Sequence, residues 1–364
     1  MIVSDVTNIL EELAPLANAE DFDNVGLLVG NPNSVVSGIL VTLDTLENVV
    51  DESITNNLNL IVSFHPIIFS GLKKITGKTY VERVVIKAIQ NNISIYSMHT
   101  ALDNSRYGVN AKICEVLNIL NPKILIPKKS TVKKLITYVP TISIDKLKNE
   151  LYKAGAGNIG NYSNCSFTNE GIGSFKPEKE AIPTIGSIGK IQLENETQLQ
   201  ITFTSSAEKN IMKALFKHHP YEEVAYEVVT LENTDQHIGM GMIGKLAQPI
   251  DTLDFLNLVK TRMNTGGIRH TSILNKKVTK VAVLGGSGAF AIKAAKAAGA
   301  DILITADVKY HQFYEAEDNM VIADIGHYET EQFTKNLLVD YLTKKIPNFA
   351  VRLSESKTNP IKYL

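Results

Sequence analysis

The chain has 364 residues, of which 44% are hydrophobic and 21% charged, and its formal net charge is −1. This composition is typical of a globular protein long enough for two or three domains of about 100–200 residues each. The near-zero charge argues against a nucleic-acid partner, and two cysteines are too few for a disulfide framework or a thiolate zinc site. Apolar runs stay well below the roughly 18 residues of a membrane span. We therefore expect a cytoplasmic protein with no membrane partner.

The first 130 residues alternate between helical and strand-like patterns. Apolar residues recur at helical spacing near the N-terminus, which predicts an amphipathic helix rather than a signal peptide. Further along, apolar runs and helical periods follow one another in the order expected of βαβ units with parallel strands. The predicted strands are 37–44, 58–66 and 92–99, and the predicted helices are 46–57 and 80–92.

The pattern changes between 131 and 231. A strand is followed by a helix that Gly155 and Gly157 close, and then by a loop rich in glycine and asparagine. Two further strand-like stretches, 188–206 and 222–233, surround a helix at 207–219. This order predicts a compact α+β module of the split β-α-β type.

The βα alternation resumes after this module. A helix ending at Gly299 suits a left-handed cap. The predicted helices are 251–263, 289–300 and 330–345, and the predicted strands are 278–286, 300–307 and 319–326. We therefore predict the α/β class, with one two-lobed unit built from 1–130 and 232–364 and an α+β domain, 131–231, inserted between the lobes.

Histidine and acidic residues follow several predicted buried strands. The carboxyl ends of parallel strands converge on one crevice, where α/β proteins bind ligands. Because only eight histidines occur in the chain, their concentration at strand ends is informative. The residues concerned are His65, His99, Asp103, Asp307, His311, His327 and Glu331.

Four of these residues predict a metal site. His327 and Glu331 are four residues apart, so on a helix they share one face, and His65 and Asp103 supply further ligands from other strands. Nitrogen and oxygen ligands suit zinc, iron or manganese. Each residue alone has an ordinary alternative: His65 as a turn residue, Asp103 as a cap, and His327 with Glu331 as a surface pair. Their joint occurrence favours the metal hypothesis.

The charge of this set indicates the chemistry. Two neutral imidazoles and two carboxylates balance one divalent cation, whereas two cations bridged by a carboxylate and hydroxide leave about one positive charge. That arrangement suits an anionic or carbonyl substrate with metal-bound water as the nucleophile. His99 and His311 are candidates for proton transfer or for support of the ligands, and the alternative for each is a structural histidine.

Two further motifs have both a functional and a structural interpretation. Residues 285–288 (GGSG) follow a predicted strand, so their backbone amides could hold an anion, with Ser287 contacting substrate. A tight turn is the favoured alternative. His218 and His219 precede Pro220 in the inserted module, where a structural turn is favoured over a role in a site.

Several blocks resemble one protein family. SFHPIIFSGLKKI, HTALDNSRYGVN, ADVKYHQ, GHYETE and DFDNVGLLVG occur in the order typical of the GTP cyclohydrolase 1 type 2 homolog family, the Ngg1-interacting-factor-three-like proteins. GAGNIGNYSNCSF, GIGSFKP and HHPYEEVAYEV resemble the PII/CutA-like insertion of its long bacterial members.

The resemblance implies a dinuclear metal site in a toroidal homohexamer. It transfers the metal ligands onto His65, Asp103, His327 and Glu331, with Glu331 as the bridge. The family usually has two consecutive histidines before the proline, whereas Phe64 stands at the first position here. A phenyl ring cannot coordinate a metal, so we expect one or two divalent ions per chain, with one position weakened.

Two functions remain open from the sequence. The first is a metal-dependent hydrolase in which metal-bound hydroxide attacks a nucleotide-like or phosphorylated substrate. The second is a non-catalytic hexameric scaffold that binds metal and senses a small molecule or partner through its inserted domain. The hydrolase is the leading hypothesis, and the replacement at Phe64 favours the scaffold.

Overall fold

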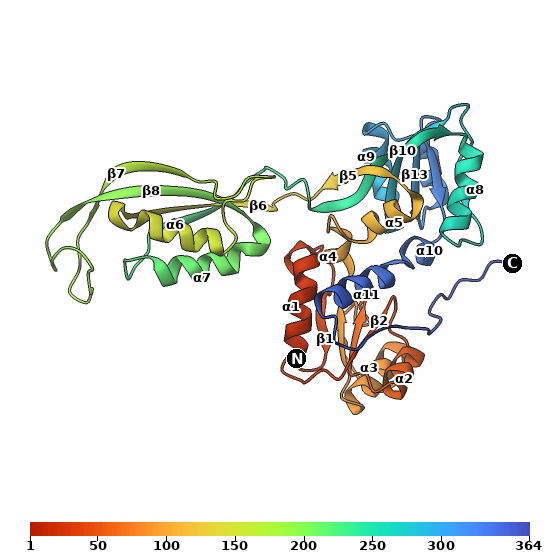
Figure 1. The fold of residues 1–364 in the computed structure, drawn as a ribbon, viewed down its shortest axis with the longest axis horizontal. Helices are drawn as coiled ribbons and strands as arrows, with labels where there is room; N and C mark the ends of the chain where they lie inside the picture. The colour runs from red at the N-terminus through yellow and green to blue at the C-terminus, as the bar shows by residue number, and fades with distance from the viewer. The chain divides into compact units, whose positions relative to one another are not determined.

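A computed structural model describes residues 1–364, which divide into two compact units (Figure 1). The first unit consists of Met1–Pro127 and Gln236–Leu364, and the second is Lys128–Asp235. The predicted inserted segment, 131–231, lies within the second unit. The α/β class is confirmed, because helices alternate with strands that form three sheets. None of the helices combines the length and the apolar character that a membrane crossing requires.

One sheet of the first unit has five strands in the order β1-β4-β3-β2-β15. β15, β2, β3 and β4 are parallel, and β1 pairs antiparallel with β4. The strands are β1 (Gly26–Val29), β2 (Ile39–Thr42), β3 (Leu60–Ser63), β4 (Ser94–Ser97) and β15 (Val351–Leu353).

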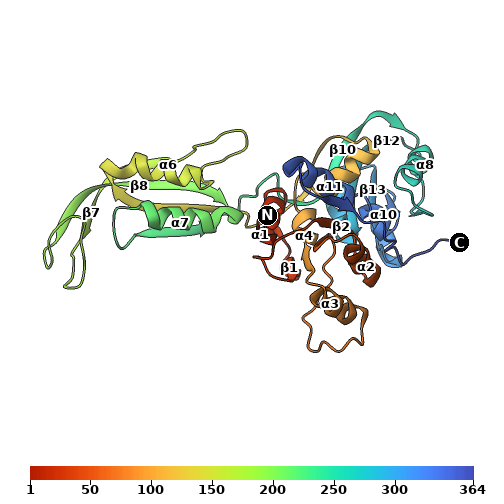
Figure 2. The same ribbon diagram turned by 60° about the horizontal axis from the view of Figure 1, so that its bottom comes forward.

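Helices cover both faces of this sheet (Figure 2). Ile39 and Val41 belong to a core cluster that includes residues of α1 and α11, whereas Leu40 packs in a second cluster with residues of α2 and α3. Successive side chains of a strand point to opposite faces, so a strand buried on both faces is apolar throughout. The helices are α1 (Val3–Leu13), α2 (Glu47–Thr55), α3 (Tyr80–Gln90) and α11 (Thr334–Lys345).

The other sheet of the first unit has six strands in the order β11-β14-β13-β12-β10-β5. β12, β13 and β14 are parallel, and the remaining pairs are antiparallel. The strands are β5 (Leu120–Pro127), β10 (Gly239–Ile250), β11 (Arg269–His270), β12 (Val278–Ser287), β13 (Ile302–Ala306) and β14 (Val321–Asp324).

The two sheets share one core. Residues of α5 (Val109–Leu117) and α8 (Thr252–Arg262) join residues of both sheets in the largest hydrophobic cluster, while α9 (Ile292–Ala297) covers the outer face of the second sheet. The two segments of the first unit also exchange strands. β15, from the second segment, completes the first sheet, and β5, from the first segment, completes the second sheet. Each sheet therefore contains strands from both segments of the first unit.

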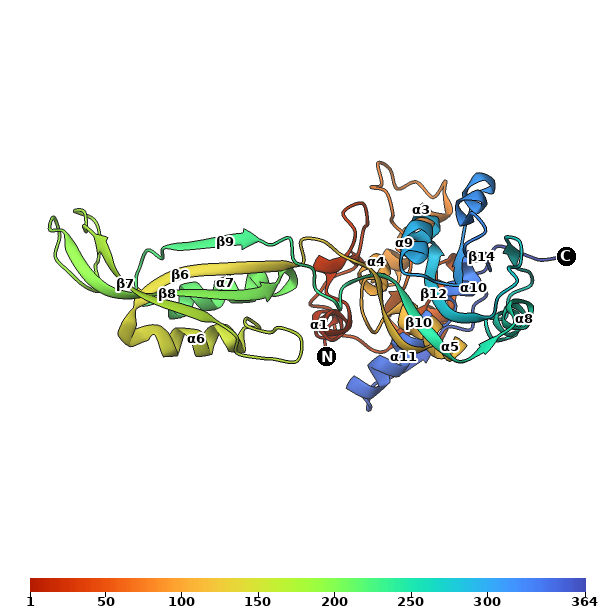
Figure 3. The ribbon, with the colours of Figure 1, turned by 90° about the horizontal axis from the view of Figure 1, so that it is seen from above.

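The second unit is an antiparallel sheet with two helices (Figure 3). Its strand order is β7-β8-β6-β9, and its core contains Leu147 and Leu151 of α6 with Ile211 and Leu215 of α7. The elements are β6 (Val132–Pro140), α6 (Ile144–Lys153), β7 (Phe167–Phe175), β8 (Gln192–Thr204), α7 (Glu208–His218) and β9 (Tyr226–Thr230).

Six strands were not predicted from the sequence: β1, β5, β7, β10, β11 and β15. Prolines or glycines interrupt the apolar alternation of β5, β7 and β10, whereas β1, β11 and β15 have only two to four residues each. The final predicted helix, 330–345, is two helices: a short α10 (His327–Glu331) and α11. The left-handed cap predicted at Gly299 is confirmed by its φ of 71°.

Candidate metal centre

Two histidines, each at the end of a strand from a different sheet, lie close together. His65 follows β3 of the first sheet, and His327 begins α10 directly after β14 of the second sheet. Four residues after His327, Glu331 lies on the same face of α10 and is almost completely buried. Since both sheets belong to the first unit, this meeting point lies inside one compact body.

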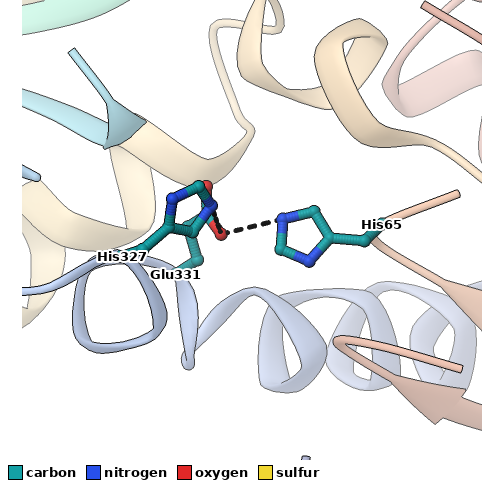
Figure 4. A group of neighbouring side chains, drawn as sticks. All are labelled: His65, His327 and Glu331. Atoms are coloured by element: carbon teal, nitrogen blue, oxygen red, sulfur yellow. Dashed lines mark ion pairs between the residues drawn. The ribbon is translucent and has the colours of Figure 1, made fainter. Parts of the chain in front are cut away.

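The donor atoms of these three residues converge (Figure 4). One ligand atom from each of His65, His327 and Glu331 lies within 4.8 Å of the others. The Glu331 Oε2 is 3.1 Å from His65 Nε2 and 3.2 Å from His327 Nε2. Neither approach has hydrogen-bond geometry, so this buried oxygen has no hydrogen-bond partner. Two imidazoles and one carboxylate therefore direct their donor atoms at a shared point.

A carboxylate fixes the orientation of each imidazole. His65 Nδ1 lies 2.8 Å from Asp44 Oδ1, and His327 Nδ1 lies 2.6 Å from Asp307 Oδ2. Ser287 donates a further hydrogen bond to Asp307. A carboxylate at Nδ1 holds that proton and leaves Nε2 for coordination, which is the usual support of a metal-binding histidine. Both rings are thus positioned to present Nε2 to Glu331.

The charges of the three residues are strongly coupled. Burial opposes ionisation of Glu331, but its ion pairs with His327 and His65 lower its pKa to about 2. Burial also opposes protonation of His65, yet Asp44 and Glu331 outweigh it and raise the pKa to about 10. For His327, Glu331 and Asp307 outweigh burial and raise the pKa to about 9. Without metal, the two protonated imidazoles therefore supply the positive charge that pairs with Glu331, which a bound cation would supply instead.

Asp103 lies beside this cluster rather than within it. It lines a cavity of about 250 Å³ together with His327 and Glu331, but its oxygens are outside the group of converging donor atoms. Its Oδ1 is buried without a hydrogen-bond partner. Burial, followed by the negative charge of Glu331, raises the pKa of Asp103 well above its usual value. Asp103 is thus an unsatisfied acceptor next to the predicted ligands.

The structure separates the two histidines predicted to transfer protons. His99 lines the cavity, its ring lies 5.3 Å from that of His65, and its Nδ1 is 2.8 Å from Asp23 Oδ1. His311 is not brought to the cavity. It is exposed in a short 3-10 helix after β13, where its ring contacts the rings of two tyrosines, Tyr310 and Tyr314. Its distance along the chain from the end of β13 carries it past the meeting point of the strand ends.

Phe64 occupies the position of the expected extra histidine. Its side chain is fully buried, and its ring lies 4.9 Å from the ring of His65 and 5.6 Å from that of His99. The residue therefore packs as part of the core directly beneath two predicted site residues.

The glycine-rich segment 285–288 has a structural role. The amide of Gly285 donates to Asn110 Oδ1 and that of Gly286 to Thr330 Oγ1, so neither is available to an anion. A side chain at Gly286 would collide with Glu331, and its φ of 67° also favours glycine. Ser287 contacts Asp307. Residues 285–287 form the end of β12, where the register to β13 shifts between Val283 and Ser287, so the structure has neither an anion cradle nor the tight turn expected here.

His219 of the histidine pair in the second unit is also structural. His219 is buried, its Nε2 donates to the Tyr138 carbonyl, and its Nδ1 accepts from the Tyr221 amide. These bonds tie the end of α7 to β6. Strand β9 begins only at Tyr226, so the pair precedes a turn.

Three carboxylates that support the site histidines were not predicted to do so from the sequence. Asp44 was the last residue of the predicted strand 37–44, Asp307 followed a strand without an assigned role, and Asp23 was not among the candidates. The available signal was their position: Asp44 and Asp307 follow β2 and β13, which neighbour β3 and β14 in their sheets. An acid at the end of the neighbouring parallel strand is placed to support a histidine.

The fold and the converging donors define an α/β protein with a candidate histidine–glutamate metal centre. The sequence profile of the family described as Duf34/NIF3 (NGG1p interacting factor 3) matches residues 1–360, and the chain belongs to this family. The family resemblance seen in the sequence is therefore confirmed.

Relatives match over the full length. A Bacillus subtilis (strain 168) protein named GTP cyclohydrolase 1 type 2 homolog is 37% identical over 365 residues, covering 99% of this chain and 98% of the relative. A Staphylococcus epidermidis protein of the same name is 34% identical and covers 100% of both chains. Among solved structures, a Bacillus cereus protein related to NIF3 is 34% identical, with a TM-score of 0.84, covering 100% of this chain and 99% of that chain.

Proposed function

We propose that this protein is a metal-dependent hydrolase that acts on a nucleotide-like or phosphorylated substrate. The observation that carries the proposal is the convergence of donor atoms from His65, His327 and Glu331 within 4.8 Å. Family membership supports it, since the curated relatives carry the name GTP cyclohydrolase 1 type 2 homolog.

The residues present fit a divalent cation. Asp103 Oδ1 is a buried acceptor without a hydrogen-bond partner, and Glu331 Oε2 has only its ion pairs with the two imidazoles. A buried carboxyl oxygen without a partner is costly. A cation held by His65, His327 and Glu331, with Asp103 beside it, would satisfy these oxygens. Imidazole and carboxylate donors without thiolates suit zinc, iron or manganese. We propose one such ion per chain, and a second where Asp103 contributes.

A divalent ion in this place would supply Lewis acidity, which polarises the scissile group and lowers the pKa of water. The protein's own residues would do the rest. Asp44 and Asp307 hold the two imidazoles in one tautomer. His99, whose Nδ1 is fixed by Asp23, would exchange a proton with the substrate through Nε2.

The cavity wall indicates which part of a substrate it would contact. Phe22 and Phe290 line the cavity and are 67% and 58% exposed, whereas no lysine or arginine lines it. A flat ring would therefore pack on the phenylalanines, and negative charge would be directed to the metal. This division suits a nucleotide-like compound better than a simple phosphate ester.

The scaffold hypothesis keeps one specific observation in its favour. Phe64 is buried in the core beside His65 and offers no ligand atom. A site with fewer ligands would serve as a binding or structural centre, with the second unit, which we propose to be PII/CutA-like, sensing a small molecule or partner.

Turnover after metal loading distinguishes these two functions. The protein would be loaded separately with zinc, manganese or iron and offered GTP, other nucleotides and phosphoesters. We expect hydrolysis that His327→Ala and Glu331→Ala abolish, while His311→Ala, the matched control outside the cavity, retains it. Metal binding with no turnover of any substrate would instead support the scaffold.

Assembly is a separate proposal. We propose a homohexameric ring on the family resemblance alone, and analytical ultracentrifugation of the full chain tests it. A mass of about one chain at micromolar concentration would contradict it.

A further inference from the structure

The last residues of the chain form an ordered strap, 354–363, without regular secondary structure. Glu52 of α2 anchors its beginning. The Glu52 carboxylate accepts hydrogen bonds from the Ser354 hydroxyl at 2.7 Å, the Glu355 amide at 2.9 Å, and the Ser356 amide and hydroxyl at 3.1 and 2.7 Å. Four donors on one carboxylate hold the strap to the first sheet as it leaves β15.

Thr358 then contacts the carboxylate that supports His65. Its hydroxyl donates to Asp44 Oδ2 at 2.8 Å, and the other oxygen, Oδ1, lies 2.8 Å from His65 Nδ1. Thr358 is buried, with 7% exposure. Because each carboxylate oxygen has its own donor, Asp44 is held in one orientation. His65 Nε2, on the opposite side of the ring, faces Glu331 at 3.1 Å.

The next residue reaches the other half of the site. Asn359 Nδ2 donates to Glu329 Oε1 at 3.2 Å. Glu329 lies in α10 between the two ligand candidates His327 and Glu331. Further along, Tyr363 packs so closely on Gly326 that a Cβ there would come within 2.6 Å of its hydroxyl. Two consecutive strap residues thus contact Asp44, which follows β2 of the first sheet, and Glu329 in α10, which follows β14 of the second sheet.

We propose that the strap positions the metal site and that Thr358 is a positioning residue, acting on His65 through Asp44. The inference rests on the proposed function only for its metal: the hydrogen-bond relay from Thr358 to His65 is a property of the chain itself. Outer partners of metal-binding histidines change metal affinity by about 10- to 100-fold when removed. Thr358 stands one bond further out, so a smaller effect follows.

Zinc affinity of three variants tests this role. Thr358→Val keeps the shape and loses the donor, Thr358→Ser restores the donor, and Thr261→Val is the matched control, which removes an exposed hydroxyl of α8 that bonds the Asn257 carbonyl. By competition with a chromogenic chelator, we expect Thr358→Val to weaken zinc binding by about three- to tenfold. Thr358→Ser and Thr261→Val should bind like the unmodified chain.

A double-mutant cycle identifies the route of the effect. If Thr358 acts through Asp44, Thr358→Val should change zinc affinity little once Asp44→Asn is present, because the two share one interaction. Full additivity of the two losses would overturn the proposal, as would a Thr358→Val variant with unchanged affinity.

A metal-free measurement separates this inference from the proposed function. In protein labelled with ¹⁵N-histidine, the Nδ1 and Nε2 shifts of His65 report its tautomer and hydrogen bonding. We expect them to move in Thr358→Val and to return in Thr358→Ser. Unchanged shifts would refute the relay even if zinc binds, while shifted signals in a protein without turnover would uphold the strap and refute the hydrolase.

Discussion

The two histidine arms of the site are built alike but are sheltered differently. In both, a strand end supplies an imidazole whose Nδ1 contacts a carboxylate from the neighbouring strand and whose Nε2 approaches Glu331. The His65 side chain is 22% exposed and its partner Asp44 29%, against 40% for His327 and 48% for Asp307. We call His65 with Asp44 the inner arm and His327 with Asp307 the outer arm. Because solvent screens exposed charge, the inner arm should contribute more to metal affinity, while the outer arm remains accessible to a substrate.

The residue shared by both arms should have the largest effect. Glu331→Gln removes the anionic oxygen that lies between the two Nε2 atoms and leaves a neutral amide there. We expect zinc affinity to fall by more than about a hundredfold, since a direct ligand outweighs its outer partners. Isothermal titration calorimetry measures this, with Glu223→Gln, an exposed carboxylate of the second unit, as the control. A loss below about tenfold would show that Glu331 is not a ligand.

The inner and outer carboxylates should differ in effect. Asp44→Asn should weaken zinc binding by about ten- to a hundredfold and Asp307→Asn by less than about tenfold, because the outer pair is more exposed and more screened. Both are tested by chelator competition at low and high salt. Equal losses of zinc affinity in the two variants would mean that solvent exposure does not distinguish the two arms.

Phe64→His should add a donor beneath the inner arm. The new imidazole would lie where the phenyl ring now packs, 4.9 Å from the ring of His65. Burying a polar group there should lower the free energy of unfolding of the metal-free protein by about 1–3 kcal/mol. Metal content by mass spectrometry should rise, and denaturant unfolding reports the cost. If metal content does not rise, the buried position cannot serve a second ion.

Metal binding should release protons, and the pH dependence follows from the raised pKa values. His65, with a pKa of about 10, and His327, with a pKa of about 9, are both protonated at neutral pH without metal. A cation must displace both protons, so apparent affinity should rise with pH up to about 10. The stabilisation of the metal-free fold by these imidazolium–carboxylate pairs is complete below pH 6.5 and is lost as pH rises through 9 and 10.

Calorimetry in buffers of different ionisation enthalpy counts the released protons. Two protons per zinc ion at neutral pH is the expected result, and Asp307→Asn should reduce the number by lowering the pKa of the outer imidazole. A count of zero would show that the imidazoles are already neutral without metal.

The smallest effect should come from removing the second unit. Pro127 is paired with Gly239 across β5 and β10, so a short glycine–serine linker can replace 128–235 without breaking the ladder. The remaining unit should fold and bind zinc within about twofold of the full chain, as expected for distant sites. Aggregation of the shortened chain would show that the first unit depends on the second.

The sequence predicted the histidines at the strand ends better than the residues that orient them. His65 and His327 were recognisable because each follows a strongly apolar strand, and strand ends converge in α/β sheets. Asp44 was not, since an acid after a strand also suits a turn, and its partner His65 is 21 residues away. Thr358 lies in a segment without periodicity, so only its hydrogen bond reveals it. The cradle considered at Gly285 and Gly286 depended on free amides, which tertiary contacts occupy.

The exchange of β5 and β15 between the sheets has a consequence for biosynthesis. The first sheet gains its fifth strand, Val351–Leu353, only after the second unit and the second sheet have been synthesised. The first sheet therefore cannot be completed from the N-terminal segment alone, whereas the second unit, continuous from 128 to 235, can fold before the C-terminal segment has been made. Because His65 and Glu331 come from these two separate segments, cation capture would be a late event in the biosynthesis of the chain.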